Sequence, residues 1–144
     1  MKKDALIEIK GKYSSDNGID SIELTTLGSF TKLNGKYYIT YREQNDQTDA
    51  TVTTVTVDGD NRVTLSRRGE ITSRMLLEKG KRHLFHYKTS FAEFMLGIFA
   101  NKISNSLSDD GGKLNFSYTL DINSGLISEN EIEINIKEAN ICRQ

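Results

Sequence analysis

The sequence predicts an all-β protein in which one antiparallel sheet forms a barrel or a sandwich. Glycine follows Asn or Asp at Asn34-Gly35 and Asp58-Gly59, and proline is absent. These dipeptides supply the positive φ angles that tight hairpin turns need. Between the turns, Thr, Ile, Val, Tyr and Phe alternate with polar residues, as in strands that bury one face. About ten such segments at regular spacing favour an antiparallel barrel or a two-sheet sandwich.

Most strands are identified by alternate positions that carry apolar side chains. Side chains alternate between the two faces of a strand, so these positions predict the buried face and their neighbours the solvated face. In chain order, the expected buried faces are Ile7 and Ile9; Ile22, Leu24, Thr26 and Phe30; Tyr37, Ile39 and Tyr41; Val63, Leu65 and Arg67; Ile71, Met75 and Leu77; His83, Phe85 and Tyr87; Leu114, Phe116, Tyr118, Leu120 and Ile122; and Ile132, Ile134 and Ile136.

Three stretches depart from this simple alternation. The segment 51–57 carries valines at positions of mixed parity, which predicts a β-bulge near Thr53 and Thr54. The polar runs 104–110 and 122–130 are expected to be longer loops.

The segment 91–100 fits two structures. Its apolar residues match a helical stripe and a strand face equally well, so the local pattern leaves both open. The helical stripe is Phe91, Phe94, Met95 and Ile98, and the strand face is Phe94, Leu96, Ile98 and Ala100.

Size and charge narrow the classes of protein to consider. The chain of 144 residues fits one domain, residues 1–144, and is long enough to bury a core without disulfides or metal. A net charge of −1 argues against a nucleic-acid binder and gives no reason to expect an anionic membrane as partner.

The one cysteine, Cys142, cannot form an internal disulfide. No apolar signal segment or membrane-spanning run occurs, so a soluble cytoplasmic protein is expected.

Several short motifs occur in an order that resembles a known family. They are Gly28-Ser29-Phe30, Tyr38-Ile39-x-Tyr41-x-Glu43, Arg67-x-Gly69, Glu78-x-Gly80, Tyr87-Lys88-Thr89-Ser90-Phe91 and Gly112-x-Leu114-x-Phe116-x-Tyr118. Over nearly its whole length, the chain resembles the YwiB-like family, bacterial proteins of unknown function that fold as calycin-like β-barrels. The resemblance implies one lipocalin-like antiparallel barrel of about eight to ten strands, with segment 91–100 as a strand. Ala92 departs from the family pattern, which has glycine there. The family has no known activity, so it assigns no role to any residue.

Polar and aromatic side chains gather near the expected ends of the odd-numbered strands. In an up-and-down meander all these ends meet at one rim, and the residues near them are Tyr13, Tyr41, Glu43, Arg67, Tyr87, Thr89 and Tyr118. Parity predicts that Glu43 and Arg67 both point inward. Barrels of this size can hold one small ligand near an open end. The sequence thus predicts a ligand site made of Tyr41, Glu43, Arg67, Tyr87 and Tyr118. The alternative is that the charged pair plugs the barrel while the tyrosines only pack.

Residues for metal binding or catalysis are sparse. His83 and His86 are three apart, which places them on opposite faces of a strand, so they cannot share a metal ion. No nucleophile elbow, phosphate-binding loop or dinucleotide motif occurs. Glu129, Glu131 and Glu133 are expected to form the solvated face of the last strand.

Three functions are compatible with this pattern. The leading hypothesis is a non-enzymatic barrel that binds a small, partly apolar ligand inside one rim, with no cofactor. An enzyme is the first alternative, and Glu43 or His83 would be its acid–base group. A protein-interaction module with a filled barrel is the second, and exposed strand faces would be its working surface. Ligand identity and oligomeric state are left open.

Overall fold

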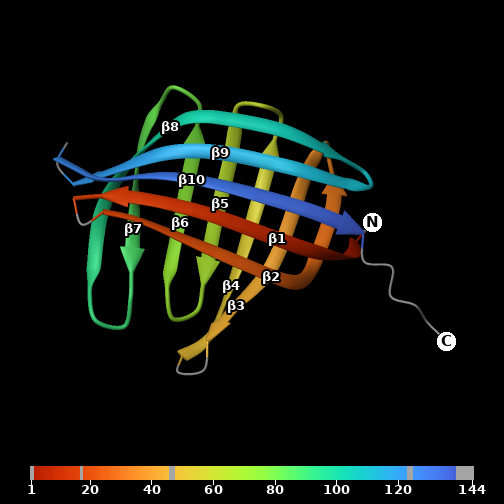
Figure 1. Ribbon diagram of the computed structural model, residues 1–144, viewed down its shortest axis with the longest axis horizontal. Helices are drawn as coiled ribbons and strands as arrows, with labels where there is room; N and C mark the ends of the chain where they lie inside the picture. Colours follow the sequence, from red (N-terminus) through yellow and green to blue (C-terminus); the bar gives the residue numbers. More distant parts are fainter. Residues whose placement is uncertain (1, 17, 46–47, 123–124, 139–144) are drawn as a thin grey trace.

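The computed structural model describes residues 2–16, 18–45, 48–122 and 125–138, which form strands and turns (Figure 1). The ten strands are β1 (Lys2–Ser15), β2 (Gly18–Leu33), β3 (Lys36–Asn45), β4 (Thr48–Asp58), β5 (Arg62–Arg68), β6 (Thr72–Glu78), β7 (Arg82–Lys88), β8 (Glu93–Ser108), β9 (Gly111–Ile122) and β10 (Gly125–Glu138). Within these described ranges, no helix is long and apolar enough to cross a membrane. Cys142 lies outside the described residues.

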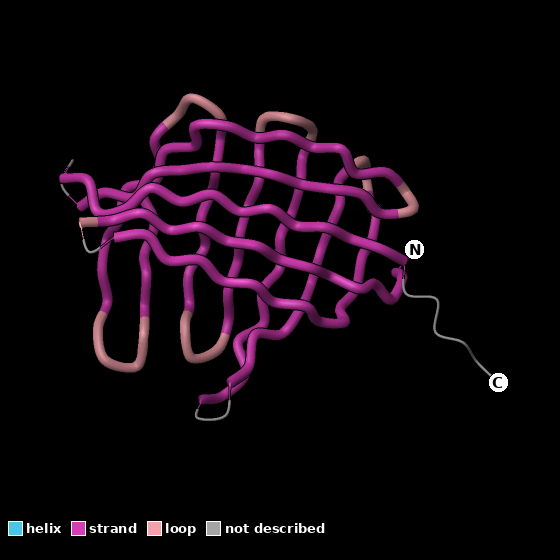
Figure 2. Tube along the Cα trace, viewed as in Figure 1, coloured by secondary structure: helices cyan, strands magenta, loops and turns pink. Residues whose placement is uncertain are grey.

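The strands form one closed antiparallel barrel in which each strand pairs with its neighbour in sequence and β1 pairs with β10. Figure 1 shows the barrel flattened into two layers. β1, β9, β10 and much of β2 and β8 run across the front, and β3–β7 cross behind them at a steep angle. Figure 2 shows the same lattice of crossing strands. The predicted all-β antiparallel barrel is thereby confirmed, at ten strands.

Two long strands, β2 and β8, pass from one layer to the other (Figure 1). In β2, an added Cβ at Gly28 would overlap the backbone oxygen of Thr40 on β3 and would come within 2.6 Å of Ile7 Cδ1. Glycine therefore permits the close approach of β1, β2 and β3 at this corner. In β8, the pairing register with β9 shifts between Ala100 and Lys102, and this bulge bends the strand.

The core fills the middle of the barrel. The alternate residues of each strand meet there, and the largest fully buried side chains include Phe116, Ile7, Ile39 and Leu77. Alternation therefore works as the sequence predicts for most strands, but Ile22 and Ile122, which were predicted to face the core, are 47% and 43% exposed. The Asn34-Gly35 turn also has the expected geometry, with φ angles of 53° and 79°.

The structure decides or corrects the predictions for residues 91–100, for Phe94 and for the segments 104–110 and 122–130. Residues 91–100 contain the start of β8, so the strand alternative is right and the helix alternative is wrong. Leu96 and Ile98 line the core, but Phe94 is 47% exposed because it lies at the very end of the barrel. The expected loops 104–110 and 122–130 are largely strand, belonging to β8 and β10.

The predicted bulge in β4 is also wrong. The register between β3 and β4 runs without a shift from Val57 to Thr51, and Thr51 and Thr53 are buried while Val52 faces outward. The register shift lies further along, between Glu43 and Asn45 on β3. The inward face of this part of β4 is therefore polar. Val52 lies on the outward face, and its apolar side chain is the reason that the sequence pattern predicted a bulge.

Candidate functional site

The candidate site lies at the end of the barrel where the odd-numbered strands finish. Toward this end β2 and β3 separate: they pair only over Ser29–Leu33 and Lys36–Thr40, next to their hairpin at the opposite end, whereas β1 pairs with β2 from Lys2 to Ser15. Figure 1 shows the β3–β4 hairpin projecting away from β2 below the barrel. The two strands therefore diverge toward this end. We call it the Glu43 end; its inward-facing polar residues are Tyr13, Tyr41, Glu43, Thr53, Arg67, Ser73, Tyr118 and Asn130.

Glu43 and Arg67 form an ion pair across β4. Arg67 Nε lies 3.6 Å from Glu43 Oε2, and the hydroxyl of Thr53 on β4 donates a hydrogen bond of 3.0 Å to the same carboxylate oxygen. The side chains of Arg67 and Glu43 are 23% and 31% exposed, so they are neither fully buried nor free in water. Glu43, Thr53 and Arg67 lie on the inward faces of β3, β4 and β5. These strands are neighbours, so one strand spacing separates each residue from the next and the three side chains meet.

A row of paired residues continues from Arg67 across the back layer. Arg67 on β5 pairs with Ser73 on β6, and Ser73 pairs with Tyr87 on β7. Ser73 is buried, and Tyr87 is half-buried against the core. Arg67 Nε and Ser73 Oγ are both buried and make no hydrogen bond with the described part of the chain. Buried polar atoms are normally hydrogen-bonded, so both atoms stand out: Ser73 Oγ has no hydrogen-bond partner among the described residues, and Arg67 Nε has only the Glu43 carboxylate at 3.6 Å, beyond hydrogen-bond distance.

The front layer contributes a second polar row. Asn130 on β10 pairs with Tyr13 on β1 and with Tyr118 on β9. Asn130 and Tyr118 are buried, and Asn130 Nδ2 donates a 3.0 Å hydrogen bond to Ser128 Oγ. The aromatic rings of Tyr118 and Phe116 stack with centroids 6.1 Å apart, and Phe116 belongs to the buried core.

The electrostatics show that the two rows face one another. Burial raises the pKa of Tyr118; Tyr13 raises it further, while Arg67 lowers it. Burial likewise raises the pKa of Tyr41, with Glu43 adding to the rise and Arg67 opposing it. The pKa of Tyr13 is raised by burial, lowered by Arg67 and raised by Glu43. The phenols therefore stay protonated and act as neutral hydrogen-bond donors around the ion pair.

The structure brings together most of the residues that the sequence analysis selected. Tyr41, Glu43, Arg67 and Tyr118 converge with Tyr13, and Tyr87 lies in the same cross-strand row. Thr89 instead closes the turn after β7, where its hydroxyl accepts the backbone N–H of Ala92. Three further buried polar residues lie at this end and are not among those that the sequence predicts: Thr53, Ser73 and Asn130. The parity of Met75 and Leu77 points to Ser73, and that of Ile132 and Ile134 points to Asn130.

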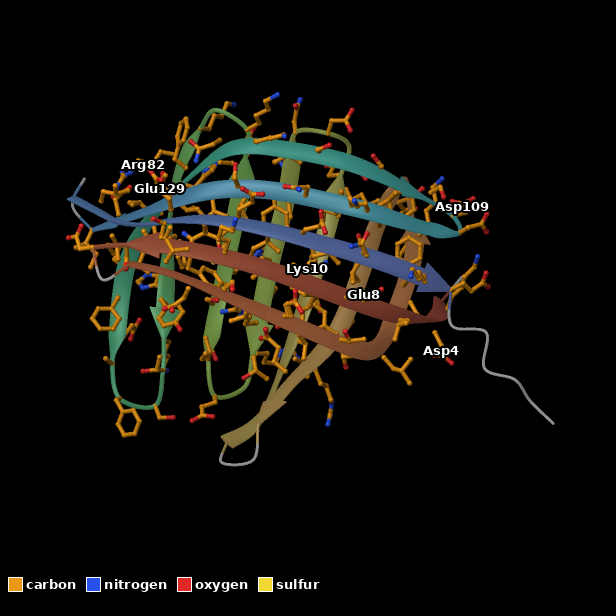
Figure 3. All side chains as sticks on the ribbon, viewed as in Figure 1. Asp4, Glu8, Lys10, Arg82, Asp109 and Glu129 are labelled. Carbon is orange, nitrogen blue, oxygen red and sulfur yellow. The ribbon has the colours of Figure 1, made fainter. Side chains whose placement is uncertain are left out.

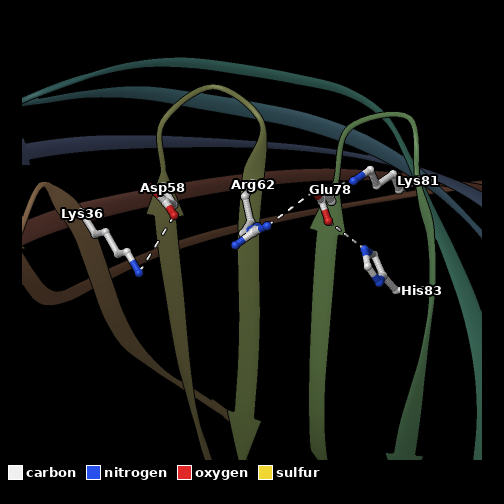
Figure 4. Close-up of polar contacts among 6 residues, drawn as sticks. All are labelled: Lys36, Asp58, Arg62, Glu78, Lys81 and His83. Carbon is white, nitrogen blue, oxygen red and sulfur yellow. Dashed lines mark hydrogen bonds and ion pairs between the residues drawn. The ribbon is translucent and has the colours of Figure 1, made fainter.

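The two histidines lie outside this site. His83 is close to the β6–β7 hairpin, at the other end of β7 from Tyr87, and its Nε2 is 3.1 Å from Glu78 Oε1 (Figure 4). His86 faces the opposite side of β7, beside Glu93 at 3.4 Å, as expected. Among the residues described, no three His, Cys, Asp or Glu side chains are grouped as a metal site. Glu129 and Glu131 are solvated, as predicted; Figure 3 shows Glu129 at the Glu43 end.

The fold and sequence match one family. The family model described as "Domain of unknown function (DUF1934)" matches residues 7–134. The chain belongs to this DUF1934 family. It is 23% identical over 116 residues to the "Uncharacterized beta-barrel protein YwiB" of Bacillus subtilis (strain 168), with 81% of this chain and 80% of that protein covered. The resemblance to the YwiB-like family is thus confirmed.

A solved structure of the DUF1934 fold agrees with the architecture. The crystal structure of the ywiB protein from Bacillus subtilis superposes with a TM-score of 0.86 at 21% identity, covering 96% of this chain and 94% of that one. The likeness establishes the fold, and the DUF1934 description names no activity.

Proposed function

We propose that this DUF1934 protein binds a small, partly apolar ligand at the Glu43 end and catalyses no reaction, in the manner of lipocalin-like barrels. The observation that carries the proposal is that two buried atoms, Arg67 Nε and Ser73 Oγ, belong to residues paired in register at the end of a filled barrel and make no hydrogen bond with the described part of the chain, although Arg67 Nε also lies 3.6 Å from the Glu43 carboxylate. A ligand oxygen between them would satisfy both atoms.

The surroundings define the ligand's chemistry. Arg67, Ser73 and the protonated phenols of Tyr41 and Tyr118 all offer hydrogen-bond donors, which suits a carbonyl or carboxylate oxygen. Glu43 already neutralises Arg67, so the ligand need carry no full charge. Aromatic rings provide an apolar wall for the rest of the molecule.

The absence of catalysis is part of the proposal. Glu43 and His83, the two acid–base candidates, lie at opposite ends of the barrel, and His83 is engaged with Glu78. A cytoplasmic location, and the lack of nucleic-acid or membrane partners, stay predictions from sequence.

Native mass spectrometry of the protein purified from its own organism tests the proposal. We expect an added small-molecule mass on the wild type that disappears in Arg67→Leu. The matched control is Arg62→Leu, which removes an arginine from the outer wall near the other end (Figure 4) and should retain the added mass. Wild-type protein that carries no added mass, or an added mass retained in Arg67→Leu, would overturn the proposal.

A second candidate function is a protein-interaction module. The outer face of β7 and β8 exposes Leu84 at 59% and Met95 at 48%, and the turn that joins the two strands exposes Phe91 at 96%. Exposed apolar residues that are grouped in this way are typical of interaction sites. Sedimentation velocity over a range of concentrations tests the simplest form, self-association. A dimer that Phe91→Ser disrupts favours it, and a monomer at every concentration contradicts it.

A further inference from the structure

The other end of the barrel holds an open cavity. It has a volume of ≈ 390 Å³ and is lined by Lys3, Phe30, Lys32 and Asp109. Lys3 and Phe30 face each other in the β1–β2 register, and Asp109 comes from the turn between β8 and β9. Figure 3 shows Asp109 at the end of the molecule opposite Glu129. We call this the Asp109 end.

Asp109 is held over this cavity by three strands. Lys3 Nζ donates a 3.0 Å hydrogen bond to the backbone oxygen of Asp109. Lys32 Nζ lies 3.4 Å from Asp109 Oδ1, and the hydroxyl of Tyr37 donates to the same oxygen at 3.5 Å. The Asp109 side chain is 70% exposed, so solvent reaches the carboxylate and an outside anion can compete for its partners.

The walls of the cavity combine positive charge with flat apolar surface. Two ammonium groups, Lys3 and Lys32, face one carboxylate, Asp109, which leaves an excess of one positive charge. Phe30 and Tyr37 stack with their planes 5° apart and centroids 5.3 Å apart, and Lys32 Nζ lies 5.5 Å from the centre of the Tyr37 ring. Such a wall suits a planar or apolar body attached to an acid group.

This cavity is separate from the Glu43 end. Lys3 and Tyr13 both point inward from β1, and about 33 Å of strand separates them at roughly 3.3 Å per residue. Between them the barrel is filled by fully buried side chains, among them Ile7, Ile39 and Phe116. A ligand at one end therefore does not reach the other.

We propose that the Asp109 end is a second binding site, which takes a small organic anion with a flat apolar body. The acid group of the ligand replaces the Asp109 carboxylate beside Lys32 and the Tyr37 hydroxyl, with Lys3 close by, and its apolar body lies against Phe30. In the free protein, the Asp109 carboxylate thus takes the place that the acid group of the ligand occupies after binding.

Fluorescence titration with anilinonaphthalene sulfonate, a flat aromatic anion, tests the site. Its uncharged parent, phenylnaphthylamine, is the matched probe without the acid group. Because exposed ion pairs contribute about 1 kcal/mol or less, we expect Asp109→Asn to tighten sulfonate binding by about two- to fivefold and Lys32→Gln to weaken it by a similar factor. Lys102→Gln, an exposed change on the outer wall of β8, should leave it unchanged.

The pattern of changes decides the outcome. Opposite effects of Asp109→Asn and Lys32→Gln on the sulfonate, with little effect on phenylnaphthylamine, support the site. Circular dichroism of each variant checks that the barrel is intact. The proposal is overturned if Asp109→Asn fails to tighten sulfonate binding, if no variant binds the sulfonate, or if Arg67→Leu at the Glu43 end abolishes binding.

Discussion

At the scale of single residues, the Glu43 carboxylate is the centre of the candidate site. It accepts a hydrogen bond from Thr53 and pairs with Arg67, and the exposure of the pair lies between that of a surface ion pair and a buried one. Exposed pairs contribute about 0–1 kcal/mol, and breaking a buried pair costs about 3–5 kcal/mol. The pair is therefore partly shielded from water, and removing one partner should have an intermediate effect.

We predict that Arg67→Leu or Glu43→Leu alone lowers the free energy of unfolding by about 1–3 kcal/mol. The double variant should lose clearly less than the sum of the two, because neither charge is left unpaired. Urea unfolding of the four proteins measures this coupling. Additive losses, or single losses below about 0.5 kcal/mol, would show that the two groups do not interact.

The tyrosines give a pH-dependent prediction. Burial first, and then Glu43, raises the pKa of Tyr41 above its ordinary value of 10.0, and burial with Tyr13 does the same for Tyr118. Above about pH 10 the unfolded chain releases these phenolic protons while the folded chain keeps them, so stability falls as the pH rises further; below it their contribution is fully present.

Urea unfolding on both sides of pH 10 measures this loss. We expect Tyr41→Phe and Tyr118→Phe to make the alkaline decline shallower than in the wild type. A decline that is equally steep in both variants would contradict the raised pKa values of these two tyrosines.

Strand parity explains how far individual site residues could be predicted from sequence. Glu43 and Arg67 follow clear apolar positions on their own strands, so their inward direction could be read from the pattern. Thr53 could not, because Val52, an outward residue, carried the stronger apolar signal. Asn130 was assigned to a loop, since polar residues around it hide the start of β10. Electrostatic effects between strands distant in sequence, such as that of Arg67 on the pKa of Tyr13, follow only from the closed barrel.

At the scale of elements, the bend in β2 closes the barrel. Gly28 sits where the backbone of β3 and the side chain of Ile7 leave no room for a Cβ. Overpacking of this kind typically costs 1–3 kcal/mol, and here the obstacle includes a backbone carbonyl that cannot move aside alone.

We predict that Gly28→Ala lowers the free energy of unfolding by more than about 2 kcal/mol. The matched control is Leu27→Ala on the same strand, because Leu27 is 61% exposed and its truncation leaves the core intact. That change should alter stability by no more than about 0.5 kcal/mol. Equal effects of the two substitutions in thermal or urea unfolding would contradict the role of Gly28 at this corner.

The strands show why element boundaries are harder to predict than element types. β8 continues to Ser108, but its bulge at Ala100–Lys102 reverses the parity of everything that follows, so Ile103 faces inward out of step with Ile98. A single alternating pattern therefore fits β8 only as far as the bulge. The strand residues after the bulge do not follow that pattern, so they were predicted to form a loop. The bulge depends on the β9 partner, which lies beyond the local sequence.

At the scale of the whole molecule, a packed middle separates two polar ends. The Glu43 end offers hydrogen-bond donors around a neutralised ion pair, and the Asp109 end offers an excess of positive charge beside an aromatic wall. The barrel of this chain thus positions two chemically different ends on one sheet.

The central claim is that the Glu43 end holds a ligand oxygen between Arg67 and Ser73. A crystal structure of the protein purified from its own organism tests this most directly. The account predicts a bound small molecule at the Glu43 end, with an acceptor atom at about 3 Å from Arg67 Nε and Ser73 Oγ. A Glu43 end that contains only ordered water, with both atoms satisfied by it, would contradict the claim.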